Sequence, residues 1–319
     1  LASVLAQEKA PAAVATELNA VENAEKDLVE LTLGWLFTRL KKPDEARIVY
    51  ERLAENAEAP QDSRQRARLL LTKSLADAGR IEDALKQVDL LGSDEKWKKP
   101  AQDAKVSLLI AAKQFKEAEK VLQDMRKAAL DEKNSVALGR LVKPYLQIEK
   151  QDEALAVCDQ MLSIHPDSAQ PYLLRAEIYK LQNKAEEVIK AYYKAVELQP
   201  GNFSTYEALA RVLDAFNRPQ AALDVLDRLE KVSQSGQMVA LFERGTMFAR
   251  WGLRTQAAEN LEKLAQQDVS ANPKLQYDIA RLLAQVGKKD QARAMLVKIQ
   301  EYSQLHLPAQ ILLADIAPD

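Results

Sequence analysis

The sequence predicts an all-α solenoid of antiparallel helix pairs, and three observations lead to this fold class. Amphipathic helical segments recur about every 34 residues through most of the 319-residue chain. Hydrophobic residues make up 47% of the chain and only nine glycines are present, so the chain has ample core material for helices. A single helix pair cannot bury both of its apolar faces, so the copies must stack and share one continuous core.

The clearest copy of the repeat runs from residue 169 to residue 202. Its first helix, which we call helix A, places Tyr172, Ala176 and Tyr179 on one side at helical spacing. A second amphipathic segment, helix B, follows Asn183 and ends at the turn-forming residues Gln-Pro-Gly-Asn of 199–202. This segment therefore predicts a helix-turn-helix of 34 residues.

The same register extends in both directions when residue 169 is taken as position 1. The eight copies start at residues 27, 65, 99, 135, 169, 203, 238 and 273. The starts are 34 to 38 residues apart, and we expect the extra residues to lie in loops.

Small and large residues alternate at fixed positions of these copies. Position 20, in the middle of helix B, is alanine in seven of the eight copies and Val188 in the other. Position 8 of helix A includes Gly34, Ala176 and Gly245, whereas positions 11 and 24 carry larger residues. A small residue opposite a large one lets two helices pack closely, so these positions predict the core.

Prolines and glycines support the register independently. Pro43 and Pro219 fall at the start of helix B, where the missing N–H costs nothing. Gly79 falls at position 15, between helices A and B, as a left-handed turn residue. Pro144 lies inside helix A of its copy and is expected to kink that helix.

The two ends of the chain carry incomplete copies. Residues 1–26 include a segment similar to helix B and predict a partial repeat before the array. Residues 307–319 predict one more helix A, either a partial repeat or a capping helix. Because the chain also lacks an initial methionine, we expect it to be a segment of a longer protein.

The pattern resembles the tetratricopeptide repeat family, whose signature has small residues at positions 8, 20 and 27, bulky ones at 4, 7, 11 and 24, and proline at 32. Pro166 and Pro200 occupy that last position in two copies, whereas position 27 departs from the signature at Leu53 and Met161. The resemblance covers nearly the whole chain. It implies a right-handed superhelix, with helix A lining a concave groove in which a protein partner binds.

Composition argues against several other functions. The 45 Lys and Arg residues nearly balance 47 Asp and Glu, and a net charge of -2 favours neither nucleic acid nor an anionic membrane as partner. Cys158 is the single cysteine, and the two histidines are far apart in the sequence, so neither a disulfide nor a Cys/His zinc site is expected. The longest apolar segments are too short to span a membrane, so we expect a soluble protein, either cytoplasmic or periplasmic.

Acidic pairs such as Glu186-Glu187 open several copies of helix B, where negative charge suits a helix N-terminus. We therefore predict no catalytic residue, no metal site and no cofactor, and we expect that the chain is not an enzyme.

A second stripe on helix A, at positions 2, 5, 6, 9, 12 and 13, lies off the core positions. The resemblance implies that this stripe lines the groove. The candidate binding residues are Arg140, Lys143, Glu177, Lys180, Arg211, Asp214, Phe242, Arg250, Tyr277 and Arg281. A cation recurs on the stripe in every copy from residue 135 onward, which favours an acidic or aromatic peptide as ligand, and a solvated helix face is the alternative.

Toward the N-terminus the same stripe is more apolar. Trp35 is either a groove anchor or a residue covered by the preceding partial repeat, and we favour the second interpretation. Because Arg211 and Arg250 lie off the core positions, reversing both charges is expected to weaken partner binding without unfolding the array.

One family function can be tested directly on the sequence. Members that bind chaperones hold a terminal carboxylate with Lys at position 5 and Asn at position 9, and no copy here has that pair. The leading prediction is thus a non-catalytic scaffold for a protein or peptide partner of open identity, without membrane insertion. A segment of a larger bacterial envelope assembly, secretion or polysaccharide-export protein is one alternative, and the targeting arm of an enzyme whose catalytic domain lies outside the chain is another.

Overall fold

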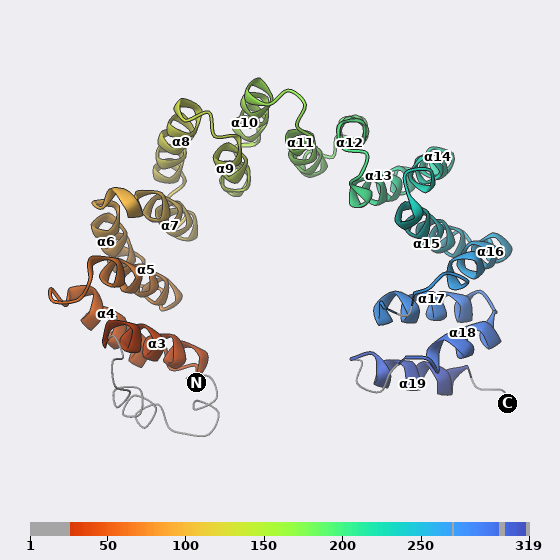
Figure 1. The fold of residues 1–319 in the computed structure, drawn as a ribbon. Coiled ribbons are helices and arrows are strands. Elements are labelled where there is room, and N and C mark those ends of the chain that lie inside the picture. The colour runs from red at the N-terminus through yellow and green to blue at the C-terminus, as the bar shows by residue number, and fades with distance from the viewer. Residues whose placement is uncertain (1–25, 270, 300–303, 317–319) are drawn as a thin grey trace. The chain divides into compact units, whose positions relative to one another are not determined.

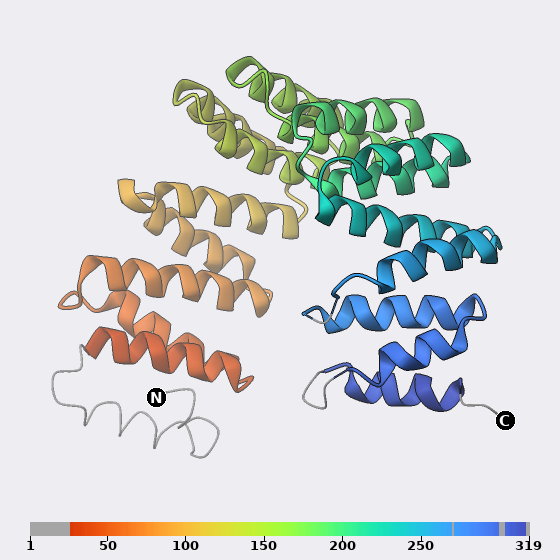
Figure 2. The ribbon, with the colours of Figure 1, turned by 45° about the vertical axis from the view of Figure 1, so that its right-hand side comes forward.

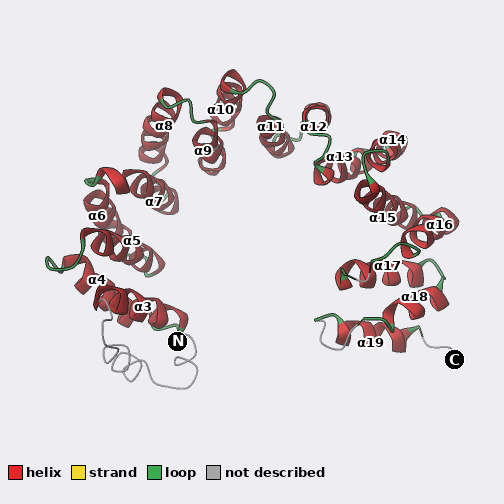
Figure 3. Cartoon of the chain, in the orientation of Figure 1, coloured by secondary structure: helices red, strands yellow, loops and turns green. Residues whose placement is uncertain are grey.

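A computed structural model describes residues 26–269, 271–299 and 304–316 (Figure 1). Within these ranges the regular structure is entirely helical, with seventeen α-helices, one short 3₁₀ helix and no strand (Figure 3). The partial repeat predicted for residues 1–26 lies, apart from Lys26, outside the described residues and stays a prediction.

The chain divides into two compact units, Leu1–Ile164 and His165–Asp319. The described helices of the N-terminal unit are α3 (Lys26–Arg39), α4 (Pro43–Glu55), α5 (Gln61–Asp77), α6 (Ile81–Gly92), η1 (Glu95–Trp97), α7 (Lys98–Ala111), α8 (Phe115–Asp131), α9 (Ser135–Gln147) and α10 (Gln151–Ile164). The described helices of the C-terminal unit are α11 (Gln170–Leu181), α12 (Ala185–Leu198), α13 (Phe203–Ala215), α14 (Pro219–Glu230), α15 (Gln234–Arg250), α16 (Arg254–Ala265), α17 (Pro273–Gln285), α18 (Lys289–Leu296) and α19 (His306–Asp315).

Within each unit the helices pack as consecutive pairs. The odd-numbered helices correspond to helix A and the even-numbered ones to helix B, and α3 packs on α4 in the same way as α11 packs on α12 (Figure 2). Neighbouring A helices also contact each other, from α3 through α5 and α7 to α9 in the first unit and from α13 through α15 to α17 in the second. The predicted all-α solenoid of helix pairs is confirmed.

The core lies between the two helices of each pair and between successive pairs. All eight residues at position 20 are buried, including Val188, and Cys158 is buried at position 24 of its copy. Gly34 shows why a small residue is needed at position 8. A Cβ added there would lie 2.3 Å from Cε1 of the buried Tyr50 ring.

Some helices begin earlier than the core pattern suggests. α15 starts at Gln234, one turn before the copy that starts at residue 238. The hydroxyl of Ser233 accepts a hydrogen bond from the Gly236 N–H at 3.1 Å and so caps the extra turn. Pro43, Pro219 and Pro273 are the first residues of their helices, and the kink expected at Pro144 inside α9 stays a prediction.

The turns between helices A and B share one backbone conformation. Position 15 has a positive φ in every copy, and only three of the eight residues are glycines, Gly79 with φ 74° among them. The others include Glu149 with φ 62° and Asn183 with φ 55°. The chain reverses there through bonds such as that from the Arg80 N–H to the Leu75 carbonyl at 2.8 Å.

Replacing Gly79 by alanine is expected to lower the free energy of unfolding by about 1 kcal/mol, because an L-residue in the left-handed region is strained. No atom lies within 4 Å of the added Cβ, so the loss is conformational and not steric. Gly201 is the matched control, since its Cβ would also meet open space and its φ is not in the left-handed range. Urea unfolding of Gly79→Ala and Gly201→Ala measures the difference, and equal stability of the two variants would contradict the assignment.

Candidate functional site

The stripe residues of the C-terminal unit lie along its four complete A helices. We call this set the A-face ribbon, and its members are Glu177, Lys180, Glu207, Arg211, Asp214, Phe242, Glu243, Arg250, Tyr277, Asp278 and Arg281. Eight of the ten candidate binding residues predicted from the sequence belong to it.

The strongest contact within the ribbon joins α13 to α15. Arg211 donates from Nε to one carboxylate oxygen of Glu243 at 3.0 Å and from Nη2 to the other. The Glu243 side chain is only 3% exposed, whereas that of Arg211 is 56% exposed. The hydrogen bonds to Glu243 raise the pKa of Arg211, and burial together with the Glu243 charge raises the pKa of neighbouring Glu207.

A second contact joins the same two helices nearer their C-terminal ends. Arg250 Nη2 lies 2.9 Å from Oδ2 of Asp214, whose side chain is 12% exposed. The indole Nε1 of Trp251 donates to Oδ1 of the same carboxylate at 2.8 Å. The Trp251 ring also packs edge-on against Phe248, with centroids 5.6 Å apart. Trp251 therefore both packs against Phe248 and holds Asp214 in place.

These two contacts show that the stripe residues of neighbouring A helices face one another on a shared surface. They also change the interpretation of the recurring cations. The sequence pattern predicts that Arg211 and Arg250 are available to a partner. In the structure each forms an ion pair with an acidic residue of the adjacent A helix, which the pattern did not indicate. Glu243 stands at position 6 of the copy after Arg211 at position 9, both on the stripe, but the register alone does not indicate that their side chains meet.

On α11 the ribbon residues are tied to helix B of their own pair. Lys180 Nζ donates to the Tyr192 hydroxyl at 2.7 Å and to Glu177 Oε1 at 2.9 Å, and the Tyr192 hydroxyl lies 3.1 Å from the same carboxylate oxygen. Burial raises the pKa of Tyr192, and the Lys180 contact opposes that rise. A cleft of about 260 Å³ opens beside this group toward α13, where Thr205 and Ala208 line its other side.

The aromatic members of the ribbon lie on α15 and α17. Phe242 and Tyr277 are half-buried and pack against the core of the C-terminal unit. Arg281 is half-exposed, and its Nη2 lies 3.9 Å from Asp278 Oδ1, which makes this ion pair weaker than those of Arg211 and Arg250.

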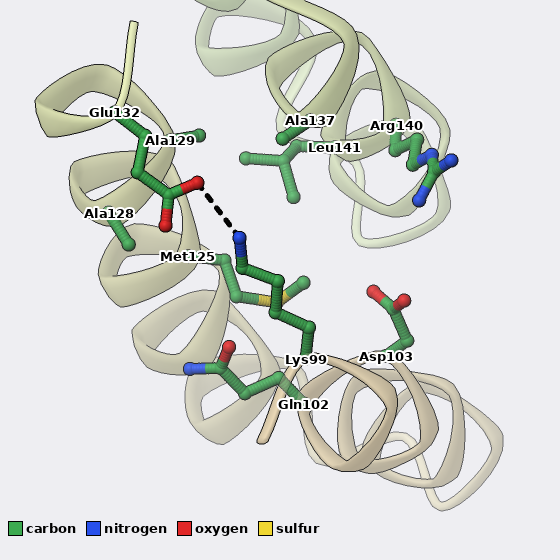
Figure 4. Close-up of a pocket in the computed structure, with 10 residues that line it drawn as sticks. All are labelled: Lys99, Gln102, Asp103, Met125, Ala128, Ala129, Glu132, Ala137, Arg140 and Leu141. Atoms are coloured by element: carbon green, nitrogen blue, oxygen red, sulfur yellow. Dashed lines mark hydrogen bonds and ion pairs between the residues drawn. The ribbon is translucent and has the colours of Figure 1, made fainter. Parts of the chain in front are cut away.

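The two remaining candidates, Arg140 and Lys143, are exposed on α9 in the N-terminal unit. Arg140 lines a small cleft of about 70 Å³ together with Asp103 of α7 (Figure 4). Burial raises the pKa of Asp103, and the Arg140 charge opposes that rise. A cleft of this volume has room for a few water molecules.

A wider cleft lies between α3 and α5, with α4 behind it, and the sequence did not indicate it. Its volume is about 550 Å³. Its lining residues are Trp35, Thr38, Arg39, Lys41, Pro43, Tyr50, Leu70, Lys73, Ser74 and Asp77. Trp35 remains 42% exposed, and the residues expected to cover it lie outside the described part of the chain. The sequence pattern indicated only the apolar residues of this face. The cations that line the cleft are Arg39 at the end of α3, Lys41 in the turn after it, and Lys73 in α5.

In the part of the chain that the structure describes, no group of three or more His, Cys, Asp or Glu side chains is placed to hold a metal ion. No described helix combines the length and the apolar character needed to cross a membrane.

Comparison with known proteins supports the fold class. The family model of the tetratricopeptide repeat matches residues 169–202, the copy from which the register was built. A search of curated proteins found no match.

Solved structures with the same kind of array share low sequence identity with this chain. The C-terminal part of a TPR repeat-containing protein from Cytophaga hutchinsonii is 13% identical, with a TM-score of 0.45, covering 84% of this chain and 94% of that one. A tetratricopeptide repeat protein from Parabacteroides merdae is 15% identical, with a TM-score of 0.42, covering 82% and 99%. YrrB, described as a TPR protein with an unusual peptide-binding site, is 22% identical, with a TM-score of 0.36, covering 58% and 96%. Similarities of this size identify no partner.

Proposed function

We propose that this chain, which is a tetratricopeptide repeat protein, is a non-catalytic scaffold that binds a segment of a partner protein across the A-face ribbon. The observation that carries the proposal is the pair of contacts between α13 and α15. They hold the guanidinium groups of Arg211 and Arg250 in defined positions while leaving their side chains 56% and 54% exposed. A cation that is already positioned loses less conformational entropy when a ligand binds.

The ribbon offers polar and apolar contacts together. Arg211 uses Nε and Nη2 for Glu243, so further N–H donors remain for a partner. Phe242 and Tyr277 add half-buried aromatic surface on the next two A helices. The ribbon has five acids and four cations, a net charge of -1. A partner segment with mixed polar and apolar side chains therefore fits it better than the strongly acidic peptide suggested by the cations alone.

Site-specific photocrosslinking tests this surface. A benzoylphenylalanine residue in place of Tyr277 is expected to capture a defined partner protein, because the aromatic ring there is partly exposed on the ribbon. The matched control is the same replacement at Tyr193, a half-buried tyrosine on α12 that is not part of the ribbon. Adding Arg281→Ala is expected to reduce the yield of the Tyr277 adduct by about threefold, a typical loss for an exposed charged contact.

Arg281 suits this experiment because its ion pair with Asp278 is long and its own side chain is 50% exposed, so its removal is expected to leave the packing intact. Equal capture of the same protein from positions 277 and 193, or an adduct yield that Arg281→Ala does not change, would contradict binding across the ribbon.

A further inference from the structure

The cleft between α3 and α5 differs from the A-face ribbon in its charges. Arg39, Lys41 and Lys73 line it with a single acid, Asp77, so its net charge is +2 although the whole chain carries -2. Among the described residues, none of the three cations forms an ion pair, in contrast to Arg211. Three cations gathered around one cleft with a single acid among them attract an anionic ligand.

One wall of the cleft is aromatic. The Arg39 guanidinium lies over the Trp35 ring, 5.5 Å from its centroid. A cation–π contact of this kind positions the guanidinium beside the ring, and the N–H groups of Arg39 remain available to a carboxylate. The exposed part of Trp35 offers apolar surface beside that cation.

The rest of the cleft is shaped by packed side chains. Tyr50 of α4 is buried, and its ring contacts the site of Gly34 on α3, so its position is fixed by the core. Leu70 and Pro43 add apolar surface near Lys73 and Lys41. A volume of about 550 Å³ is within the range of pockets that accommodate several side chains.

We propose that this cleft binds an acidic segment of a partner protein, in which Asp or Glu side chains lie next to an aromatic or large apolar one. The carboxylates would contact Arg39, Lys41 and Lys73, and the apolar side chain would pack on Trp35. The inference rests on the proposed function only in that the occupant is a protein segment. The cleft residues lie in the N-terminal unit and the ribbon residues in the C-terminal unit, so an experiment can contradict one proposal and leave the other standing.

Fluorescence anisotropy with three labelled peptides tests the proposal on the full chain. One peptide carries Asp and Glu around a central Phe, the second replaces these acids by Asn and Gln, and the third replaces them by Lys. We expect the acidic peptide to bind about tenfold more tightly than its neutral isostere, the loss of affinity typical of one or two charge-assisted contacts. We also expect its affinity to fall as the salt concentration rises.

Variants of the cleft then locate the binding site. Arg39→Ala and Lys73→Ala are each expected to weaken binding of the acidic peptide about fivefold, and Trp35→Ala is expected to do the same through lost apolar contact. The matched control is Lys120→Ala, which removes an exposed cation from α8, outside the cleft. Unchanged circular dichroism and unfolding midpoints establish that each variant is folded.

Three results would overturn the proposal. They are no binding of the acidic peptide at millimolar concentration, equal affinity for the neutral isostere, and full affinity in the Arg39→Ala and Lys73→Ala variants. Displacement of the peptide by a single-stranded oligonucleotide of equal charge at lower concentration would also overturn it, because the cleft would then be a phosphate-binding site.

Discussion

Replacing Gly34 by alanine is expected to lower the free energy of unfolding by about 2 to 3 kcal/mol, a large effect for one methyl group. The added Cβ would lie 2.3 to 2.8 Å from three atoms of the Tyr50 ring. That ring is rigid and buried, so α3 and α4 must move apart or Tyr50 must leave its rotamer. Urea unfolding followed by circular dichroism measures the loss.

Other copies of the repeat suggest the compensating change. Ala210 at position 8 stands with Leu226 at position 24, and Ala280 stands with Leu296 in the last copy. The double variant Gly34→Ala with Tyr50→Leu is therefore expected to recover most of the lost stability. Gly92→Ala is the control, since its Cβ would meet the nearest atom at an ordinary 3.4 Å. A double variant no more stable than Gly34→Ala alone would show that the clash with Tyr50 is not the cause.

One copy has alanine at position 8, Ala176, together with tyrosine at position 24, Tyr192. There the tyrosine hydroxyl is held by Lys180 and Glu177 at the edge of a cleft. Tyr192 thus packs in the same core cluster as Ala176 with its hydroxyl held at the edge of a cleft, whereas Tyr50 packs opposite Gly34.

The features that the sequence predicted correctly are those repeated in every copy. A buried residue at position 20, alanine in seven copies and Val188 in the other, and the turn at position 15 recur at a fixed spacing, so a single chain contains eight observations of each. The residue type at position 15 does not by itself predict the left-handed conformation in every copy. Gly79 identified the left-handed position, whereas Glu149 adopts the same conformation although its own preference is against it.

The features that the sequence missed depend on contacts between copies. Nothing in the pattern of α15 alone indicates that Glu243 is buried, because its carboxylate is bound by Arg211 of another helix, α13. The cleft between α3 and α5 likewise depends on side chains from two A helices, the turn after α3 and the neighbouring helix α4. Periodicity determines which side of a helix faces a neighbour, but it does not determine which charged side chains meet there.

The Arg211→Ala variant is expected to lose about 2 to 3 kcal/mol of unfolding free energy, because the buried Glu243 carboxylate would be left without its partner. Arg218→Ala is the matched control. Arg218 also forms two hydrogen bonds to a glutamate 32 residues away, Glu186, but that side chain is 54% exposed. Its loss is expected to be below about 1 kcal/mol. Urea unfolding of both variants measures the contrast, and equal losses would show that burial of Glu243 does not matter.

A double variant separates the loss of the hydrogen bonds between Arg211 and Glu243 from the cost of leaving the buried Glu243 charge without a partner. Arg211→Ala leaves the Glu243 charge without a partner, and Glu243→Gln removes that charge. The combined variant is therefore expected to be more stable than Arg211→Ala alone by about 1 kcal/mol or more. The same geometry changes the expectation for charge reversal. A glutamate at position 211 would stand beside Glu243 and Glu207, so loss of partner binding in that variant would report unfolding as well as recognition. Arg281, whose ion pair with Asp278 is long, is therefore the ribbon cation whose removal measures recognition. The Arg211→Ala variant measures how the A helices are held together.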